Sequence, residues 1–232
     1  MMTILDSNIM STTEYVQRMR IKFSKFGPTR FISHLDVART WERALNRAKI
    51  PMAYSQGFNR RPLMSFATAT PLGTTSDCEF VDIWTKELLD PIETGAILSE
   101  KMAPGIGILE INEVPLAGKK LQVITIDSTF EITITEEIDR DELKQRVVDL
   151  LAADQILRER VVKKKVKEFD LRPMVYDLHL ADSDDQTIML IARLALEPSN
   201  TGRVDQVMFH LGLDPLDART HRKNVTLIQE YL

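Results

Sequence analysis

The sequence predicts an α+β protein made of two ferredoxin-like halves in tandem, each an antiparallel sheet with helices on one face. Two observations lead to this prediction. Residues 18–114 carry strand and helix patterns in the order β-α-β-β-α-β, and a similar order returns from residue 122 after a linker-like stretch. The predicted boundaries are a disordered lead-in over 1–17, a first domain over 18–115 and a second domain over 121–232.

In the first half, alternation predicts the opening strand and a capping pattern predicts the first helix. Residues 18–25 alternate basic and apolar side chains, so one face of a strand should be buried. Ser33 is the predicted N-cap of a helix, with Asp36 three residues on, and Pro51 ends it. The apolar positions of the strand are Met19, Ile21 and Phe23, and those of the helix are Leu35, Ala38, Trp41, Leu45 and Ala48.

The remaining elements follow from apolar runs between glycine and proline. The first half continues with a strand at 52–54, a loop at 55–65, a connector at 66–73, a strand at 78–84, a helix at 91–102 and a strand at 106–114. The second half has strands at 122–135 and 156–166, a helix at 139–153, a hairpin of 175–180 with 187–196, a helix at 203–211 and a strand at 224–228. It thus carries one strand more than the first.

Charge is distributed unevenly along a chain whose formal net charge is −4. Residues 18–61 contain eleven basic and two acidic residues, which gives +9, whereas residues 76–113 contain nine acidic and two basic residues, which gives −7. One interpretation is a basic surface that faces an anionic partner. The other is that the two stretches lie side by side and neutralise each other.

Composition limits the location and the chemistry. There is no apolar run near the ~18 residues that span a bilayer and no signal-peptide pattern, so we expect a cytoplasmic protein without a membrane partner. Cys78 is the single cysteine, so the chain cannot form an internal disulfide or supply the thiolates of an iron–sulfur cluster. We expect it to pack as a small, half-buried hydrophobe. The four histidines are scattered, and we predict neither a metal site nor a cofactor.

Several spaced motifs agree with a known family. They are residues 23–36, residues 51–59, Pro62-Leu-Met-Ser-Phe66, Pro71-Leu-Gly73, residues 168–173 and Gly212-Leu-Asp-Pro215. In this order they resemble the radical-SAM-linked protein family, which has no known function and is fused to, or encoded beside, radical S-adenosylmethionine enzymes. The match is dense over about 18–114 and looser afterwards. The resemblance implies an accessory role beside such an enzyme, in the modification of RNA or of a translation component.

The loop over 54–62 has the chemistry of an RNA-binding segment. It combines groups that stack on bases, hydrogen-bond their edges and pair with phosphates: Tyr54, Gln56, Phe58, Asn59, Arg60 and Arg61. The alternative is a rigid connector in which Phe58 packs into the core and Asn59 closes a turn. Arg60-Arg61-Pro62 also departs from the His-Pro pair that the family resemblance implies here, which weakens a catalytic interpretation of the loop.

Three further groups complete the predicted ligand site. Arg30 and His34 should lie near the loop, and the first helix should present Arg39, Arg43 and Arg47 on one face. On the predicted strand 156–166 and just beyond it, Lys163, Lys165 and Lys167 alternate, so they should form a stripe for a phosphate backbone. The alternative is an edge strand protected by its lysines against aggregation.

The leading hypothesis is a non-catalytic accessory or substrate-recognition protein that acts with a radical S-adenosylmethionine enzyme and binds RNA. The second is a metal-independent RNA-processing endonuclease of tandem ferredoxin-like fold, with His34 and either Tyr54 or a lysine as acid–base groups. Against it, the chain lacks the glycine-rich loop that such enzymes usually carry near the C-terminus. The third is a protein–protein scaffold. Ser33, His34 and Asp36 do not form a catalytic triad, because neighbours at a helix start point in different directions.

Overall fold

The computed structural model describes residues 15–56, 58–162, 165–182 and 187–231. The first half contains six elements in the expected order. They are β1 (Gln17–Lys25), α1 (His34–Arg47), β2 (Met64–Phe66), β3 (Thr75–Thr85), α2 (Pro91–Lys101) and β4 (Ile106–Val114).

The second half follows a connector at 115–120. Its elements are α3 (Leu121–Ile124), β5 (Thr125–Ile134), α4 (Arg140–Ala152), β6 (Leu157–Val162), β7 (Lys165–Asp170), β8 (Val175–Leu180), β9 (Met189–Glu197), β10 (Asn200–Thr201), α5 (Val204–His210) and β11 (Ala218–Leu227). The described residues therefore form a mixed α+β fold, which is the predicted class. They contain five α-helices.

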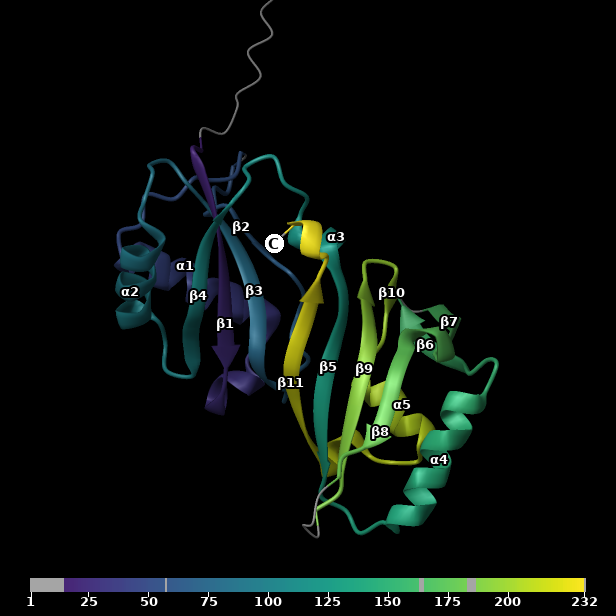
Figure 1. Ribbon diagram of the computed structural model, residues 1–232. Coiled ribbons are helices and arrows are strands. Elements are labelled where there is room, and N and C mark those ends of the chain that lie inside the picture. Colours follow the sequence, from purple (N-terminus) through teal and green to yellow (C-terminus); the bar gives the residue numbers. More distant parts are fainter. Residues whose placement is uncertain (1–14, 57, 163–164, 183–186, 232) are drawn as a thin grey trace, which may run out of the picture.

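A single sheet of nine strands crosses both halves (Figure 1). Its order is β10-β9-β5-β11-β3-β1-β4, with β8 paired to β9 and β2 paired to β3. Every pairing is antiparallel except that of β11 with β3, which joins the halves at two residue pairs, His221 with Thr75 and Arg222 with Ser76. The halves thus share one sheet rather than forming two.

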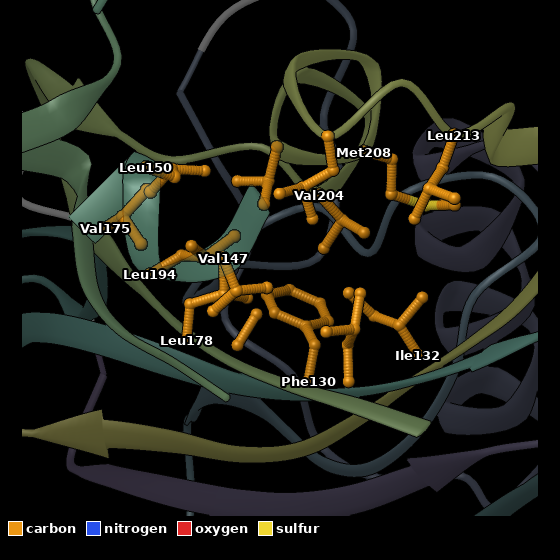
Figure 2. Close-up of a cluster of buried hydrophobic side chains, with 14 of the residues drawn as sticks. Phe130, Ile132, Val147, Leu150, Val175, Leu178, Leu194, Val204, Met208 and Leu213 are labelled. Atoms are coloured by element: carbon orange, nitrogen blue, oxygen red, sulfur yellow. The ribbon is translucent and has the colours of Figure 1, made fainter. Parts of the chain in front are cut away.

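Helices cover one face of each half. In the first half, Met19, Ile21 and Phe23 are buried against α1 and α2, as the alternation of β1 predicts. In the second half, α4 and α5 cover β5 and β9, and Figure 2 shows Phe130 of β5 in one cluster with Val147 of α4 and Met208 of α5. This burial of apolar side chains is the main force that holds each half together.

The helix caps form as the sequence predicts. The Ser33 hydroxyl accepts a hydrogen bond from the backbone N–H of Asp36, at 3.2 Å, and donates one to the Asp36 carboxylate, at 2.7 Å. Asp139 caps α4 in the same way, through the backbone N–H of Glu142 at 2.8 Å. Both caps satisfy donors that a helix start leaves without partners.

Several details differ from the sequence prediction, and one of them is that residues 122–124, predicted as the start of a strand, belong to α3. Met52 and Tyr54 form only isolated bridges, and the short strand is β2, inside the predicted loop and connector. The predicted strand at 156–166 is instead a two-stranded hairpin of β6 and β7. Leu35 is 64% exposed, because the buried face of α1 passes through Val37, Trp41, Ala44 and Leu45. The last strand begins at Ala218, six residues before the predicted start.

No helix of the described ranges is long and apolar enough to cross a membrane.

Candidate functional site

Part of the basic stretch is buried and neutralised inside the sheet. Arg18 and Arg20 are 2% and 7% exposed, and both bind the carboxylate of Asp82, which is fully buried. The Arg18 guanidinium also donates to the carbonyl oxygens of Gly118 and Lys119, at 2.9 and 2.7 Å. β1 and β3 are neighbours, so the acidic segment neutralises part of the basic one, and the net charge of +9 overstates the basic surface.

The arginines of α1 lie on the surface, where two of the three are engaged. Arg39 pairs with Asp36 at 3.1 Å, and Arg47 donates to the backbone carbonyl of Lys101. The hydroxyl of Ser33, followed by Arg39, holds the pKa of Asp36 below its usual value. Arg43 is exposed and forms no ion pair with any residue that the structure describes. The helix face is therefore basic, but less so than three isolated arginines would make it.

His34 lies exposed in the first turn of α1. Its ring meets the edge of Phe66 at a centroid distance of 5.2 Å, and within the described ranges it has neither a hydrogen bond nor an ion pair. Ser33 and Asp36 bond to each other in the cap, so the structure forms no triad from Ser33, His34 and Asp36. Beside this turn, the Arg30 guanidinium lies 4.5 Å from the centre of the Phe31 ring, which is 62% exposed.

The loop over 54–62 is closed at its base and exposed at its tip. Tyr54 and Pro62 form a bridge, and Ser55 and Arg61 exchange two hydrogen bonds, of 2.8 and 3.1 Å. Tyr54 packs against the first core, whereas the Phe58 side chain is completely exposed. The alternative in which Phe58 packs into the core is therefore wrong.

The other side chains of the loop tip also face solvent. Gln56, Asn59, Arg60 and Arg61 are exposed, and neither arginine forms an ion pair with a described residue. The loop leads into β2 at Met64, while His34 contacts Phe66 at the other end of this strand. The ring contacts of His34 and Arg30 are with Phe66 and Phe31 and not with Phe58 at the tip, so the predicted site divides into two neighbouring parts.

The second basic run lies on the β6–β7 hairpin, far along the chain from the loop. Lys165 and Lys167 are exposed and alternate on β7, so they share a face as predicted. Lys167 lies opposite Arg160, whose guanidinium is 5.2 Å from the centre of the Phe169 ring. Lys163 lies outside the described residues.

Sequence reasoning missed a polar network at the junction of β3 and β11. His221 bonds through Nδ1 to the Thr75 hydroxyl at 2.9 Å and through Nε2 to the Asp77 carboxylate at 3.1 Å. Lys223 pairs with the same carboxylate at 3.0 Å, and Lys223 and then His221 hold the pKa of Asp77 below its usual value. No local pattern could reveal this network, because its members are about 146 positions apart.

The described ranges contain no candidate metal centre. They contain no group of three or more histidine, cysteine, aspartate or glutamate residues that could hold an ion. Cys78 is 1% exposed and therefore more buried than expected, and burial raises the pKa of its thiol. Its side chain is a part of the apolar contacts between the halves.

Comparison with known proteins gives a family match and distant structural similarity. Residues 18–204 match the model of a family described as "uncharacterized protein conserved in bacteria" (DUF2344). No curated protein has a matching sequence.

The chain is also similar to three solved structures, at low identity. One is a Cbf5–Nop10–Gar1 complex, with TM-score 0.48, 9% identity, and coverage of 95% of this chain and 56% of that chain. The others are an H/ACA RNP bound to a substrate RNA containing 2′-deoxyuridine (0.44, 8%, 97% and 56%) and an archaeal box H/ACA sRNP Nop10–Cbf5 complex (0.42, 8%, 90% and 47%). This chain spans about half the length of each.

Proposed function

The chain belongs to the family described as uncharacterized proteins conserved in bacteria, and we propose that it is a non-catalytic accessory protein that recognises RNA for a radical S-adenosylmethionine enzyme. The observation that carries the RNA part is the tip of the 54–62 loop. There a fully exposed Phe58 ring stands beside Arg60 and Arg61, which pair with no described residue. An exposed ring with flanking cations can stack on a base while the cations bind its phosphates.

The base of the loop supports this proposal, because it holds the tip in place. Ala53 donates its backbone N–H to the Trp84 carbonyl at 2.8 Å, and Trp84 donates to the Leu63 carbonyl at 3.2 Å. These bonds tie both ends of the loop to the end of β3. A loop that is ordered before binding loses less conformational entropy when RNA docks.

Further RNA contacts would come from the other predicted groups. Arg30 lies beside the exposed Phe31 ring, His34 contacts Phe66, and Arg39 and Arg43 extend the surface along α1. Lys165 and Lys167 form a separate stripe on the hairpin, which Lys163 would extend. Such cations bind a phosphate backbone without reading its sequence.

We propose the radical enzyme as a partner because residues 23–36, 51–59, 62–66 and 71–73 resemble the radical-SAM-linked family. Within this chain the one cysteine is buried and its thiol pKa is raised, so it is a poor cluster ligand. Radical chemistry would therefore reside in the partner, and this chain would present the substrate to it.

We also propose that the chain is built of two ferredoxin-like units. The strand orders β4-β1-β3-β2 in the first half and β11-β5-β9-β8 in the second support two ferredoxin-like units, at 18–115 and 121–232. In the second unit, the β6–β7 hairpin is inserted between α4 and the strand β8. Two related units side by side would offer one long surface to an extended RNA strand.

The RNA part is tested by binding of labelled single-stranded RNA between about 50 and 200 mM salt. In the double variant Arg60→Ala/Arg61→Ala, the loss of two phosphate contacts should weaken binding and lower the salt slope by about 1.4. In Phe58→Ala, the loss of stacking should cost about 1–3 kcal/mol of binding free energy. The matched control, Lys144→Ala/Arg219→Ala, removes two exposed cations elsewhere and should bind as the wild type does. Equal affinity and an equal slope for all four proteins would refute RNA recognition by this loop.

The partner is tested by affinity purification from the native cell, with nuclease treatment as a second arm. A radical S-adenosylmethionine enzyme together with a defined RNA is the expected result. An enzyme that stays bound after nuclease treatment, together with no RNA affinity, would instead identify a protein scaffold. RNA cleavage in the presence of a chelator that disappears in His34→Ala would contradict the non-catalytic role.

A further inference from the structure

A cavity of about 510 Å³ lies between the two halves, apart from the 54–62 loop. On one side it is lined by residues of the 68–74 segment, between β2 and β3. On the other side it is lined by residues of β5, β11 and α5. Its volume falls within the range of about 300–1,000 Å³ that is typical of small-molecule sites.

Arg222 of β11 lines this cavity with its side chain almost completely buried, at 2% exposure. Its Nη1 donates to both carboxylate oxygens of Glu79, at 2.9 and 3.0 Å, and its guanidinium lies 5.2 Å from the centre of the Phe130 ring. Its Nε–H has no acceptor among the described residues. A buried donor without an acceptor costs about 1–3 kcal/mol, and more when it is charged, so this N–H favours any ligand that can accept from it.

The buried charges beside Arg222 leave room for an anion. Lys25 is 1% exposed and lies close enough to Glu79 and Arg222 for both to act on its charge. The Glu79 carboxylate thus binds Arg222, and the buried Lys25 adds a second positive charge nearby. Burial first, and Arg222 as well, lower the pKa of Lys25, which Glu79 opposes. A negative charge in the cavity would stabilise both cations.

The walls suit an organic molecule better than a bare ion. Pro71 and Leu72 line the cavity, and Leu72 is 71% exposed, whereas Phe130, Val204 and Met208 of the second core lie almost completely buried beneath it. Thr68 and Thr74 belong to the same wall as Leu72. An apolar surface with a few polar groups is the usual composition of a ligand pocket.

We propose that this cavity binds a small organic anion, whose carboxylate or phosphate oxygen accepts the Nε–H of Arg222 while its apolar body lies against Pro71 and Leu72. The site is independent of the RNA surface proposed above. It is formed by both halves, so a bound ligand also favours their association.

Calorimetric titration of the full chain with benzoate, adenosine monophosphate and inorganic phosphate tests the proposal. Benzoate offers a carboxylate on an apolar ring, the nucleotide a phosphate on an organic body, and inorganic phosphate the oxyanion alone. Benzyl alcohol is the matched neutral control. Binding of benzoate or of the nucleotide, without binding of the alcohol, is the expected result and identifies the acid group. The proposal is overturned if no anion binds, or if the alcohol binds as well as benzoate.

Two variants locate the site. Arg222→Met removes the donor, so affinity should fall about tenfold or more, and it also destabilises the fold because Glu79 loses its buried partner. Ala69→Trp narrows the cavity from its exposed rim and leaves the buried charges intact, which keeps the test valid if Arg222→Met fails to fold. Ala96→Trp, on the surface of α2, is its control. Unchanged affinity in Ala69→Trp would show that the anion binds elsewhere.

Discussion

The arginines of this protein lie in two contrasting regions. Arg18, Arg20 and Arg222 lie inside the molecule, on β1 and β11, with carboxylates as partners. Arg39, Arg60 and Arg61 lie on the surface of α1 and of the 54–62 loop, where only Arg39 has a carboxylate partner among the described residues. The first group holds strands and halves together, and the second is available to a partner. A count of charges along the chain does not separate these two roles.

The contrast shows that acidic residues on a neighbouring strand can neutralise a basic segment of the sequence. Arg20 lies directly opposite Asp82 in the pairing of β1 with β3, so alternation along two separate segments brings opposite charges together. A charge without its partner in such a place would be costly. The buried pairs and the exposed cations should therefore respond in opposite ways to mutation, the first in stability and the second in binding.

The largest effect is expected for Asp82→Asn. This change removes the buried carboxylate that binds both Arg18 and Arg20, and it should reduce the free energy of unfolding by about 3–5 kcal/mol. Urea denaturation followed by circular dichroism measures the change. A loss below about 1 kcal/mol would mean that the buried pairs behave like surface pairs, and the contrast would fail.

A smaller effect, which depends on pH, is expected for Asp77→Asn at the junction of β3 and β11. Lys223 and His221 lower the pKa of Asp77 in the folded state. The carboxylate therefore contributes stability that is fully present above its unfolded pKa of about 3.9 and is lost as the pH falls through the lower folded value. The pair is partly exposed and screened, so the loss at neutral pH should be below about 1 kcal/mol.

Urea denaturation of Asp77→Asn and of the wild type at several pH values checks this expectation. The two proteins should differ at neutral pH and converge in acid. A difference that stays constant into acid would assign the effect to the changed hydrogen bonds rather than to the charge.

The smallest effect is expected for Arg39→Ala. This exposed side chain pairs only with Asp36, and both are screened by solvent, so the unfolding midpoint should hardly move. Thermal denaturation beside Asp82→Asn gives the direct comparison. A large drop in the midpoint would show that α1 depends on this surface pair.

Local patterns were enough to place the elements with strong periodicity or strong end signals. The alternation of Met19, Ile21 and Phe23 gave β1, and the cap at Ser33 gave α1. The short strand β2 was misplaced, because its three residues are too few to show a period. The β6–β7 hairpin was predicted as one strand, because residues 158–168 contain no glycine, proline, asparagine, aspartate or serine that would indicate a turn.

The candidate site, too, could be predicted only in part from local patterns. The 54–62 loop could be proposed from its residue types alone, but the exposure of Phe58 came only with the folded chain. The cavity at Arg222 could not be proposed at all, because its walls combine residues of the 68–74 segment with residues as distant in the sequence as Arg222.

The sequence by itself determined the α+β class, the order of elements in the first half and the absence of enough cysteines for a cluster, since each follows from local spacing or from composition. The tertiary structure decided which charges are buried and how the halves join. Glu79 and Arg222 meet across 143 positions through the parallel pairing of β3 with β11. Such a contact depends on how whole strands pack, and no local pattern encodes it.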